Sequence, residues 1–210
     1  IGYMLTASAT SRADAISNPF NITPGTVSAA QSTLTSSGSS MTVGSSSITL
    51  TVTLKDANGN LVTAGGQVVS ISGGGTGSIG SVTNNNDGTY TAVVTAPSAP
   101  SSGSFVSTVN GSAIEGGTGS QQTVTVNYVA GSATKFVVTG SGTQGVGASQ
   151  TITVTAQDAY GNTATSFTGA QAIVFSGANS SSSPATAPTV AGTAFGTSTS
   201  LTFTNGVATA

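Results

Sequence analysis

Residues that could do chemistry are few in this chain, and two of them begin similar turns. The segments Asp56-Ala-Asn-Gly-Asn60 and Asp158-Ala-Tyr-Gly-Asn162 each start with a carboxylate. Carboxylate and carbonyl oxygens are the ligands that Ca²⁺ prefers, so each turn is a candidate calcium site. The alternative is that each Asp side chain accepts hydrogen bonds from N–H groups of its own turn. We favour turn capping, because neither Asp has an acidic neighbour in the sequence.

Catalytic chemistry needs a nucleophile beside a base, or a facing pair of carboxylates. The chain has no Cys and no His, and only five of its 210 residues are acidic. Without His, the usual general base and the commonest metal ligand are both missing. We therefore expect no enzyme, no catalytic residue, no metal site and no cofactor.

Charge is scarce along the whole chain. Only three basic and five acidic residues occur among 210, and the net charge is −2, whereas about a quarter of the residues in an ordinary soluble domain are charged. Ser and Thr fill 71 positions and supply the polar surface instead. There is no basic patch for nucleic acid or anionic lipid. No apolar run approaches the ~20 residues that span a bilayer, so we expect no membrane insertion.

Three Asn-x-Ser/Thr triplets fit the acceptor pattern for N-glycosylation. They begin at Asn21, Asn110 and Asn179. In a chain this rich in Ser and Thr such triplets also arise by chance. A glycoprotein and a plain hydroxyl surface are both compatible with the sequence.

The elements that must position the two turns are β-strands. Each turn follows a run in which Thr alternates with aliphatic residues, Ile48–Leu54 before the first and Ile152–Ala156 before the second. This period of two, rich in β-branched residues, is typical of half-buried strands and predicts an all-β fold. The two Asp residues lie 102 positions apart, about the length of one β-sandwich domain. A unit that recurs at this spacing indicates tandem domains.

The domains are cut unevenly by the two ends of the chain. Residues 25–131 contain about seven predicted strands with frequent turn signals, enough for a complete immunoglobulin-like sandwich. Residues 132–210 end at a strand that corresponds to the region Asn86–Val94, so the last two strands of that sandwich are absent. Residues 1–24 resemble such a closing pair of strands. We therefore predict one complete domain and one domain split between the termini.

The segment Val43–Asn60, together with Asn86–Pro97, resembles the bacterial immunoglobulin-like repeats of the invasin and intimin adhesins. Asp-x-x-Gly-Asn followed by Asp-Gly-Thr-Tyr carries the resemblance, which covers residues 26–129. The resemblance implies tandem β-sandwiches in an extracellular or cell-surface stalk or filament, whose repeats act as spacers. It implies no catalytic residues.

We predict a structural subunit or repeat of an extracellular filament or adhesin stalk. Residues 1–24 of one unit would complete residues 132–210 of the next, either by head-to-tail self-association or by covalent continuation of the same repeat. The predicted donor residues are Tyr3, Leu5, Ala7, Ile16, Phe20 and Ile22, and the predicted acceptor core consists of Phe136, Val138, Ile152, Val154, Phe175 and Phe203.

The alternative function is a carbohydrate- or receptor-binding immunoglobulin-like adhesin module. Sugar sites usually display exposed aromatic side chains. Trp is absent, and Tyr160, in the second turn, is the best candidate for such a side chain.

Overall fold

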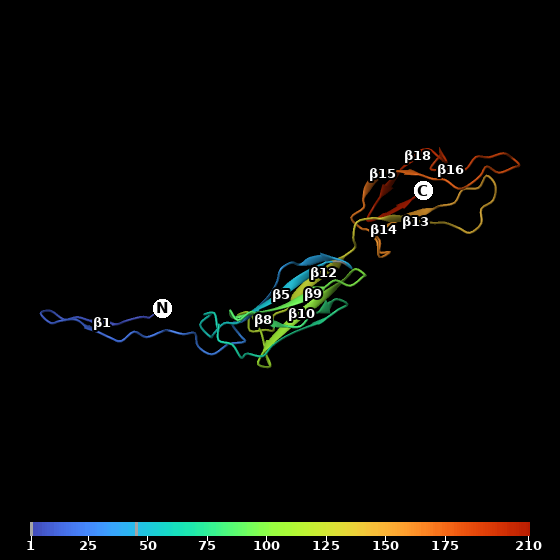
Figure 1. Cartoon of the computed structure of the whole chain (residues 1–210). Helices are drawn as coiled ribbons and strands as arrows, with labels where there is room; N and C mark the ends of the chain where they lie inside the picture. The colour runs from blue at the N-terminus through green and yellow to red at the C-terminus, as the bar shows by residue number, and fades with distance from the viewer. Residues whose placement is uncertain (1, 45) are drawn as a thin grey trace.

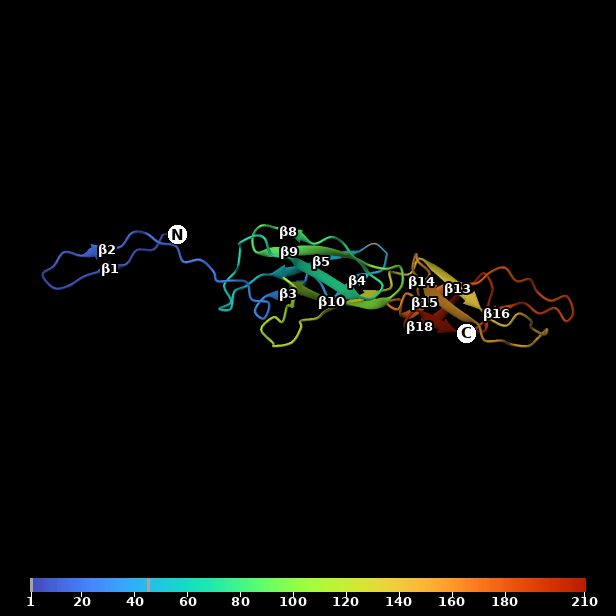
Figure 2. The same cartoon turned by 90° about the horizontal axis from the view of Figure 1, so that it is seen from below.

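The computed structural model describes residues 2–44 and 46–210, so Ile1 of the predicted donor segment lies outside the described residues. Three parts follow one another along an elongated molecule: an N-terminal hairpin, a central domain and a terminal domain (Figures 1 and 2). Every regular element in the described ranges is a strand. No helix in the described part of the chain is long and apolar enough to cross a membrane.

The central domain is a sandwich of two sheets. One sheet has the order β3-β5-β9-β7, with β8 also paired to β9. The other has the order β11-β10-β12-β4, with β6 paired to β10. All pairs are antiparallel except β12 with β4, which run parallel. The strands are β3 (Thr33–Ser36), β4 (Ser40–Thr42), β5 (Ser47–Thr53), β6 (Val69–Gly74), β7 (Ser78–Ile79), β8 (Thr83–Asn84), β9 (Thr89–Thr95), β10 (Ser101–Val109), β11 (Ser112–Ala113) and β12 (Val124–Val129).

Alternation in the sequence builds the core of this sandwich. In β5 the aliphatic residues Ile48, Leu50 and Val52 are buried while the Thr residues between them face outward. The long strands β9, β10 and β12 contribute similar buried rows, and the rows of the two sheets meet. The core therefore includes residues from both sheets, namely Leu34, Met41, Val43, Ile48, Leu50, Val52, Leu54, Val62, Ile71, Tyr90, Ala92, Val94, Phe105, Val109, Ile114, Val126 and Tyr128.

One predicted boundary in the central domain was wrong. The sequence predicts a strand over 67–71 and a bend at Gly73–Gly75, but β6 runs through Val69–Gly74 and the bend begins only at Gly75. The reason is the close approach of a neighbouring strand. A Cβ atom on Gly73 would lie 2.4 Å from Cδ1 of Phe105. Glycine is needed inside this strand so that the Phe105 ring can pack against its backbone.

The terminal domain has fewer strands. One sheet has the order β13-β14-β19, and β15 pairs with β18 in a second, while β16 and β17 form a small hairpin. The strand boundaries predicted from the sequence agree with those of the structure to within a few residues at each end. The strands are β13 (Lys135–Thr139), β14 (Thr153–Gln157), β15 (Gly169–Val174), β16 (Thr189–Val190), β17 (Thr193–Ala194), β18 (Ser198–Phe203) and β19 (Val207–Thr209). Its buried core is small and consists of Val154, Ala156, Leu201, Phe203 and Ala208.

The N-terminal hairpin stands apart from both sandwiches in Figures 1 and 2. It pairs β1 (Thr6–Ala7) with β2 (Ala15–Ile16), and a further bridge joins Tyr3 to Phe20. Its apolar side chains are largely exposed. A two-stranded hairpin is marginally stable in water by itself, so this segment needs a surface to pack on.

Strand register makes the two sandwiches directly comparable. Val52 and Val154 each lie four residues before the Asp of the turn. Val52 pairs with Leu34, and Val154 pairs with Val138, so Leu34 and Val138 hold the same position. Leu34 is 0% exposed, whereas Val138 is 52% exposed.

A second pair of positions shows the same contrast. Val43 and Val146 each precede a glycine with positive φ, Gly44 at 78° and Gly147 at 75°. Val43 is 1% exposed because it lies beside β12, whose Val129 carbonyl accepts its N–H at 3.0 Å. Val146 is 61% exposed. In the terminal domain, Val138 pairs with the buried Val154 yet has no covering strand among the described residues, and the turn residue Val146 is exposed as well.

We predict that replacing valine with alanine lowers the free energy of unfolding much more at position 43 than at position 146. Val43→Ala should lower the free energy of unfolding of the central domain by about 2 kcal/mol, because it removes two buried carbons and leaves a cavity. Val146→Ala should change the stability of the terminal domain by less than about 0.5 kcal/mol. Urea denaturation combined with hydrogen exchange of peptides from each domain measures both. Equal costs would mean that Val146 is already covered.

Candidate functional site: the paired turns and the open face of the terminal domain

The first turn is organised around the Asp56 carboxylate. Its Oδ1 accepts the N–H groups of Asn58 and Asn60, both at 2.9 Å. The Asn60 side-chain amide donates to both oxygens, at 3.2 and 3.0 Å. Oδ2 also accepts the N–H of Gly25 at 2.9 Å. The carboxylate thus caps its own turn and fastens the residue at which the chain enters the central domain.

The second turn repeats this arrangement. Asp158 Oδ1 accepts the N–H groups of Tyr160 and Asn162, both at 2.9 Å, and Oδ2 accepts the N–H of Gly131 at 3.0 Å. The Asn162 amide donates to both carboxylate oxygens. Gly131 is the entry residue of the terminal domain, just as Gly25 is for the central domain.

These contacts support turn capping over calcium binding at both positions. Every carboxylate oxygen of the two Asp residues already accepts N–H donors. Within residues 2–44 and 46–210, no group of three or more His, Cys, Asp or Glu residues gathers in a metal-binding arrangement. The sequence predicted the cap within the turn but missed the contact with the entry glycine. The only signal was Gly25 and Gly131 preceding their Asp by similar distances, 31 and 27 residues.

Hydrogen bonding also sets the acidity of these groups. The Asn60 side chain, followed by the Gly25 N–H, lowers the pKa of Asp56 from 3.8 to about 2. At Asp158 burial raises the pKa, but the hydrogen bonds from the Asn162 side chain and the N–H groups of Gly131, Asn162 and Tyr160 outweigh it, so the pKa is lowered overall. Both groups are therefore ionised at neutral pH.

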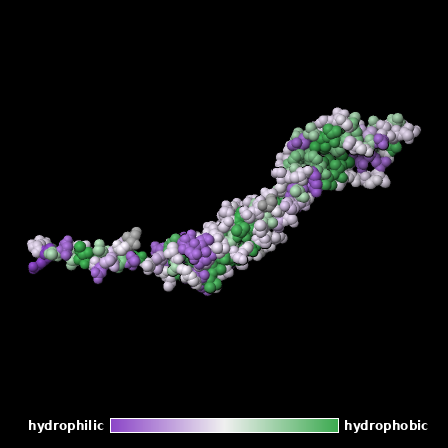
Figure 3. All heavy atoms as spheres, in the orientation of Figure 1, coloured by the Kyte–Doolittle hydropathy of each residue, from purple (hydrophilic) through white to green (hydrophobic). Residues whose placement is uncertain are grey.

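The predicted acceptor core divides into covered and uncovered residues. Val154 and Phe203 are fully buried, and Ile152 and Phe175 are half-buried. Phe136 packs edge-on against Phe167 and lies near Phe203, with ring centroids 5.5 and 5.7 Å away, yet it is 43% exposed. The Val138 side chain is exposed to solvent, as described above. Hydrophobic surface accordingly covers much of the terminal domain in Figure 3.

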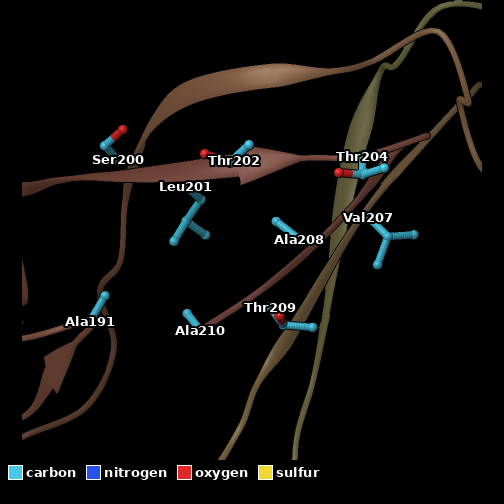
Figure 4. A pocket seen from close by; sticks show the side chains of 9 residues that line it. All are labelled: Ala191, Ser200, Leu201, Thr202, Thr204, Val207, Ala208, Thr209 and Ala210. Carbon is cyan, nitrogen blue, oxygen red and sulfur yellow. The ribbon is translucent and has the colours of Figure 1, made fainter.

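A cavity of about 560 Å³ opens at another place in the terminal domain, beside β18 and β19. Figure 4 shows Leu201, Ala208 and Ala210 around the same space. By register Ala208 holds the position of Tyr90 in the central domain, because Val154 pairs with Ala208 as Val52 pairs with Tyr90. The small side chain leaves this edge unfilled.

The predicted donor and glycosylation residues are accessible. Tyr3, Leu5, Ala7, Ile16, Phe20 and Ile22 are all exposed on the hairpin. Asn21, Asn110 and Asn179 are exposed too. Asn110 is engaged in a turn, since its Oδ1 accepts the Val68 N–H at 3.0 Å and its Nδ2 donates to Gln67 at 2.6 Å.

Residues 28–131 match the family model for domain 3 of invasin. The central domain is an invasin-type immunoglobulin-like domain. The solved structures that resemble the chain include two bacterial proteins. The Escherichia coli adhesin FdeC is 25% identical over 99% of this chain and 64% of its own, with a TM-score of 0.55. Invasin, a bacterial integrin-binding protein, is 25% identical over 81% of this chain and 34% of its own, with a TM-score of 0.56.

This chain therefore spans less than two thirds of either structure. A comparison with curated proteins found no match. The predicted resemblance to invasin-type repeats is confirmed, as is the all-β, immunoglobulin-like fold class. FdeC is an adhesin, and invasin is an integrin-binding protein.

We predict that acid weakens the central domain through Asp56. The folded pKa of about 2 lies below the ordinary value of 3.8, so the unfolded chain takes up the proton first as the pH falls. The stability that Asp56 contributes is full above about pH 4 and is lost as the pH drops through 3.8 toward 2. Urea denaturation at several pH values measures it. Asp56→Asn should lower stability at pH 7 and flatten the profile in this window, whereas an unchanged profile would contradict the assignment.

Proposed function

We propose that this chain is a structural segment of an extracellular adhesin stalk or filament, in which a strand pair equivalent to residues 1–24 completes the domain formed by residues 132–210. The invasin-type domain and the likeness to FdeC and invasin support the adhesin assignment and a cell-surface location. The exposure of Val138 and Val146, whose counterparts in the central domain are buried, supports the strand-completion part of the proposal. The division of the chain into residues 1–24, 25–131 and 132–210 is part of the same proposal.

The first step of the argument is what covers the matched row in the central domain. Leu34 of β3 donates its N–H to Gln122, just before β12, at 2.7 Å. Val43 follows β4, which pairs in parallel with β12. The strand that lies beside these two positions is thus the last one of the domain, β12, which is itself paired with β10. The counterparts of this pair would bury Val138 and Val146.

The second step is that the N-terminal hairpin has the pairing of those closing strands. Val126 lies five residues before the entry glycine Gly131 and pairs with Gly103 of β10. Phe20 lies five residues before the entry glycine Gly25 and pairs with Tyr3. The hairpin therefore leads into the central domain just as the β10–β12 pair leads into the terminal domain.

The third step is chemical fit. The hairpin offers an apolar row at Tyr3, Leu5 and Ala7, which alternates as a strand on a sandwich core must. The terminal domain offers the open edge of β15, which among the described residues pairs with β18 alone. Strand addition would satisfy the backbone groups of that edge and cover both apolar surfaces. Because the contact joins different surfaces of successive units, it propagates along a filament.

Covalent and non-covalent versions of this contact use equivalent strand pairs on the same surface of the terminal domain. In one, the hairpin belongs to a separate subunit. In the other, the chain continues beyond Ala210 into an equivalent strand pair. Both place the same two strands over Val138 and Val146.

The binding-module alternative has less support. The exposed aromatic residues in the described ranges are Tyr3, Phe20, Phe136 and Tyr160. Tyr3 and Phe20 lie together on the N-terminal hairpin, with ring centroids 6.3 Å apart, whereas Phe136 lies on β13 and Tyr160 in the second turn of the terminal domain. A sugar platform would need several of them side by side.

We predict that adding a copy of residues 1–24 after Ala210 closes the terminal domain. Ala210 corresponds to Ala92 by register, and eleven positions separate Ala92 from Gly103. A direct fusion would leave only three positions between Ala210 and the added Tyr3, so the fusion needs a linker of about eight residues. Hydrogen exchange of β13 and β15 should slow by at least tenfold, and Val146→Ala should now cost about 2 kcal/mol.

The matched control is the same fusion with Leu5→Ser and Ile22→Ser in the added copy only. It keeps the length and every polar residue of the added copy but removes Leu5 from the apolar row and Ile22 from the second half of the hairpin, and it should leave exchange of β13 and β15 unchanged. Equal exchange in both fusions would refute strand completion. The adhesin assignment would survive that result, because it depends on the central domain.

A further inference from the structure

The second turn reaches beyond its own domain. The Asn162 side-chain amide, which holds the Asp158 carboxylate, also donates to the backbone carbonyl of Ser98 at 2.8 Å. Ser98 lies in the loop between β9 and β10 of the central domain. One side chain thus joins the turn, the fastened linker and the preceding domain.

The Tyr160 ring makes a second contact across this junction. A Cβ atom on Gly44 would lie 2.0 Å from Cζ and 2.3 Å from the hydroxyl oxygen of Tyr160, so the ring rests directly on the Gly44 backbone. Gly44 has φ +78°, a conformation that favours glycine. Its N–H donates to the Pro97 carbonyl at 2.8 Å. Gly44 and the loop that contains Ser98 therefore form one continuous contact surface.

The linker between the two domains is itself held. β12 ends at Val129 and β13 begins at Lys135, and Gly131 between them donates to Asp158. Domains joined by a small interface are expected to move relative to one another unless specific contacts prevent it. Here three contacts converge on one five-residue turn: Gly131 with Asp158, Asn162 with Ser98, and Tyr160 with Gly44.

We propose that Tyr160 and Asn162 dock the terminal domain onto Gly44 and the Ser98 loop of the central domain, and that this contact fixes the angle between the two domains. The interaction surface is the end of the central domain, and its partner is the turn Asp158–Asn162 of the following domain. The half-exposed Tyr160, 51% accessible, is a spacer contact between domains and is not a platform for a sugar ring. This proposal is independent of strand completion.

The chain is well suited to a direct test because it contains no cysteine. Thr125→Cys in β12 and Ala172→Cys in β15 place one spin label on an exposed strand position of each domain. Double electron–electron resonance then measures the distribution of distances between the domains. With the docking contact intact, the distribution should be a single narrow peak.

Tyr160→Ala should at least double the width of that peak, because it removes the ring from Gly44. Tyr160→Phe should keep the narrow peak, since the ring remains. Asn58→Ala is the matched control, because Asn58 holds the same position in the first turn. Gly44→Ala disrupts the same contact from the central domain and should also broaden the peak. The result therefore does not depend on one variant.

A broad distribution in the chain without these substitutions would overturn the proposal. So would a peak that stays equally narrow in both Tyr160→Ala and Gly44→Ala. Circular dichroism confirms that each variant is folded, and broadening without loss of strand signal is the supporting result.

Discussion

The whole structure depends on one constraint of the β-sandwich: a sheet can bury its apolar face only against another sheet. The central domain meets this constraint with two complete sheets, and its inward row from Leu34 to Tyr128 is buried. The terminal domain has the same inward row but fewer strands to cover it. The hairpin at the N-terminus consists of strands whose apolar side chains have no core to pack against and are exposed. Each supplies what the other lacks, and this reciprocity is the physical basis of the proposed stalk.

The recurring Asp-x-x-Gly-Asn turn solves a different problem, that of joining domains in a chain without cysteine. Its carboxylate collects N–H donors from the turn and from the entry glycine, which anchors each linker to the body of the domain that it enters. An ionised carboxylate holds these N–H groups more strongly than a neutral acceptor would, because charge-assisted hydrogen bonds are stronger than neutral ones. In a chain with only eight charged residues, two of the five acids serve these two turns. Scarce charge is thus concentrated where the chain must be held.

Much of this could be predicted from sequence, because the period of two and the spacing of the turns follow directly from residue types. The Thr-aliphatic alternation located β5 and β14, and the Asn-Gly and Asp-Gly turns separated the strands. The predicted start of the bend at Gly73 was wrong because three glycines resemble a turn, whereas packing of the Phe105 ring keeps Gly73 in a strand and the bend begins at Gly75. The contacts of Gly25 and Gly131 with the turns, and of Tyr160 with Gly44, could not be predicted, because they join residues 27 to 116 positions apart with no local pattern.

The most direct test of the central claim is cryo-electron microscopy of the native assembled protein, with attention to the terminal domain. The account predicts two additional strands over β13 and β15 that bury Val138 and Val146, with side-chain density matching Tyr3, Leu5 and Phe20 of the following unit. A terminal domain that keeps this face open to solvent, or a hairpin folded back onto its own central domain, would contradict it.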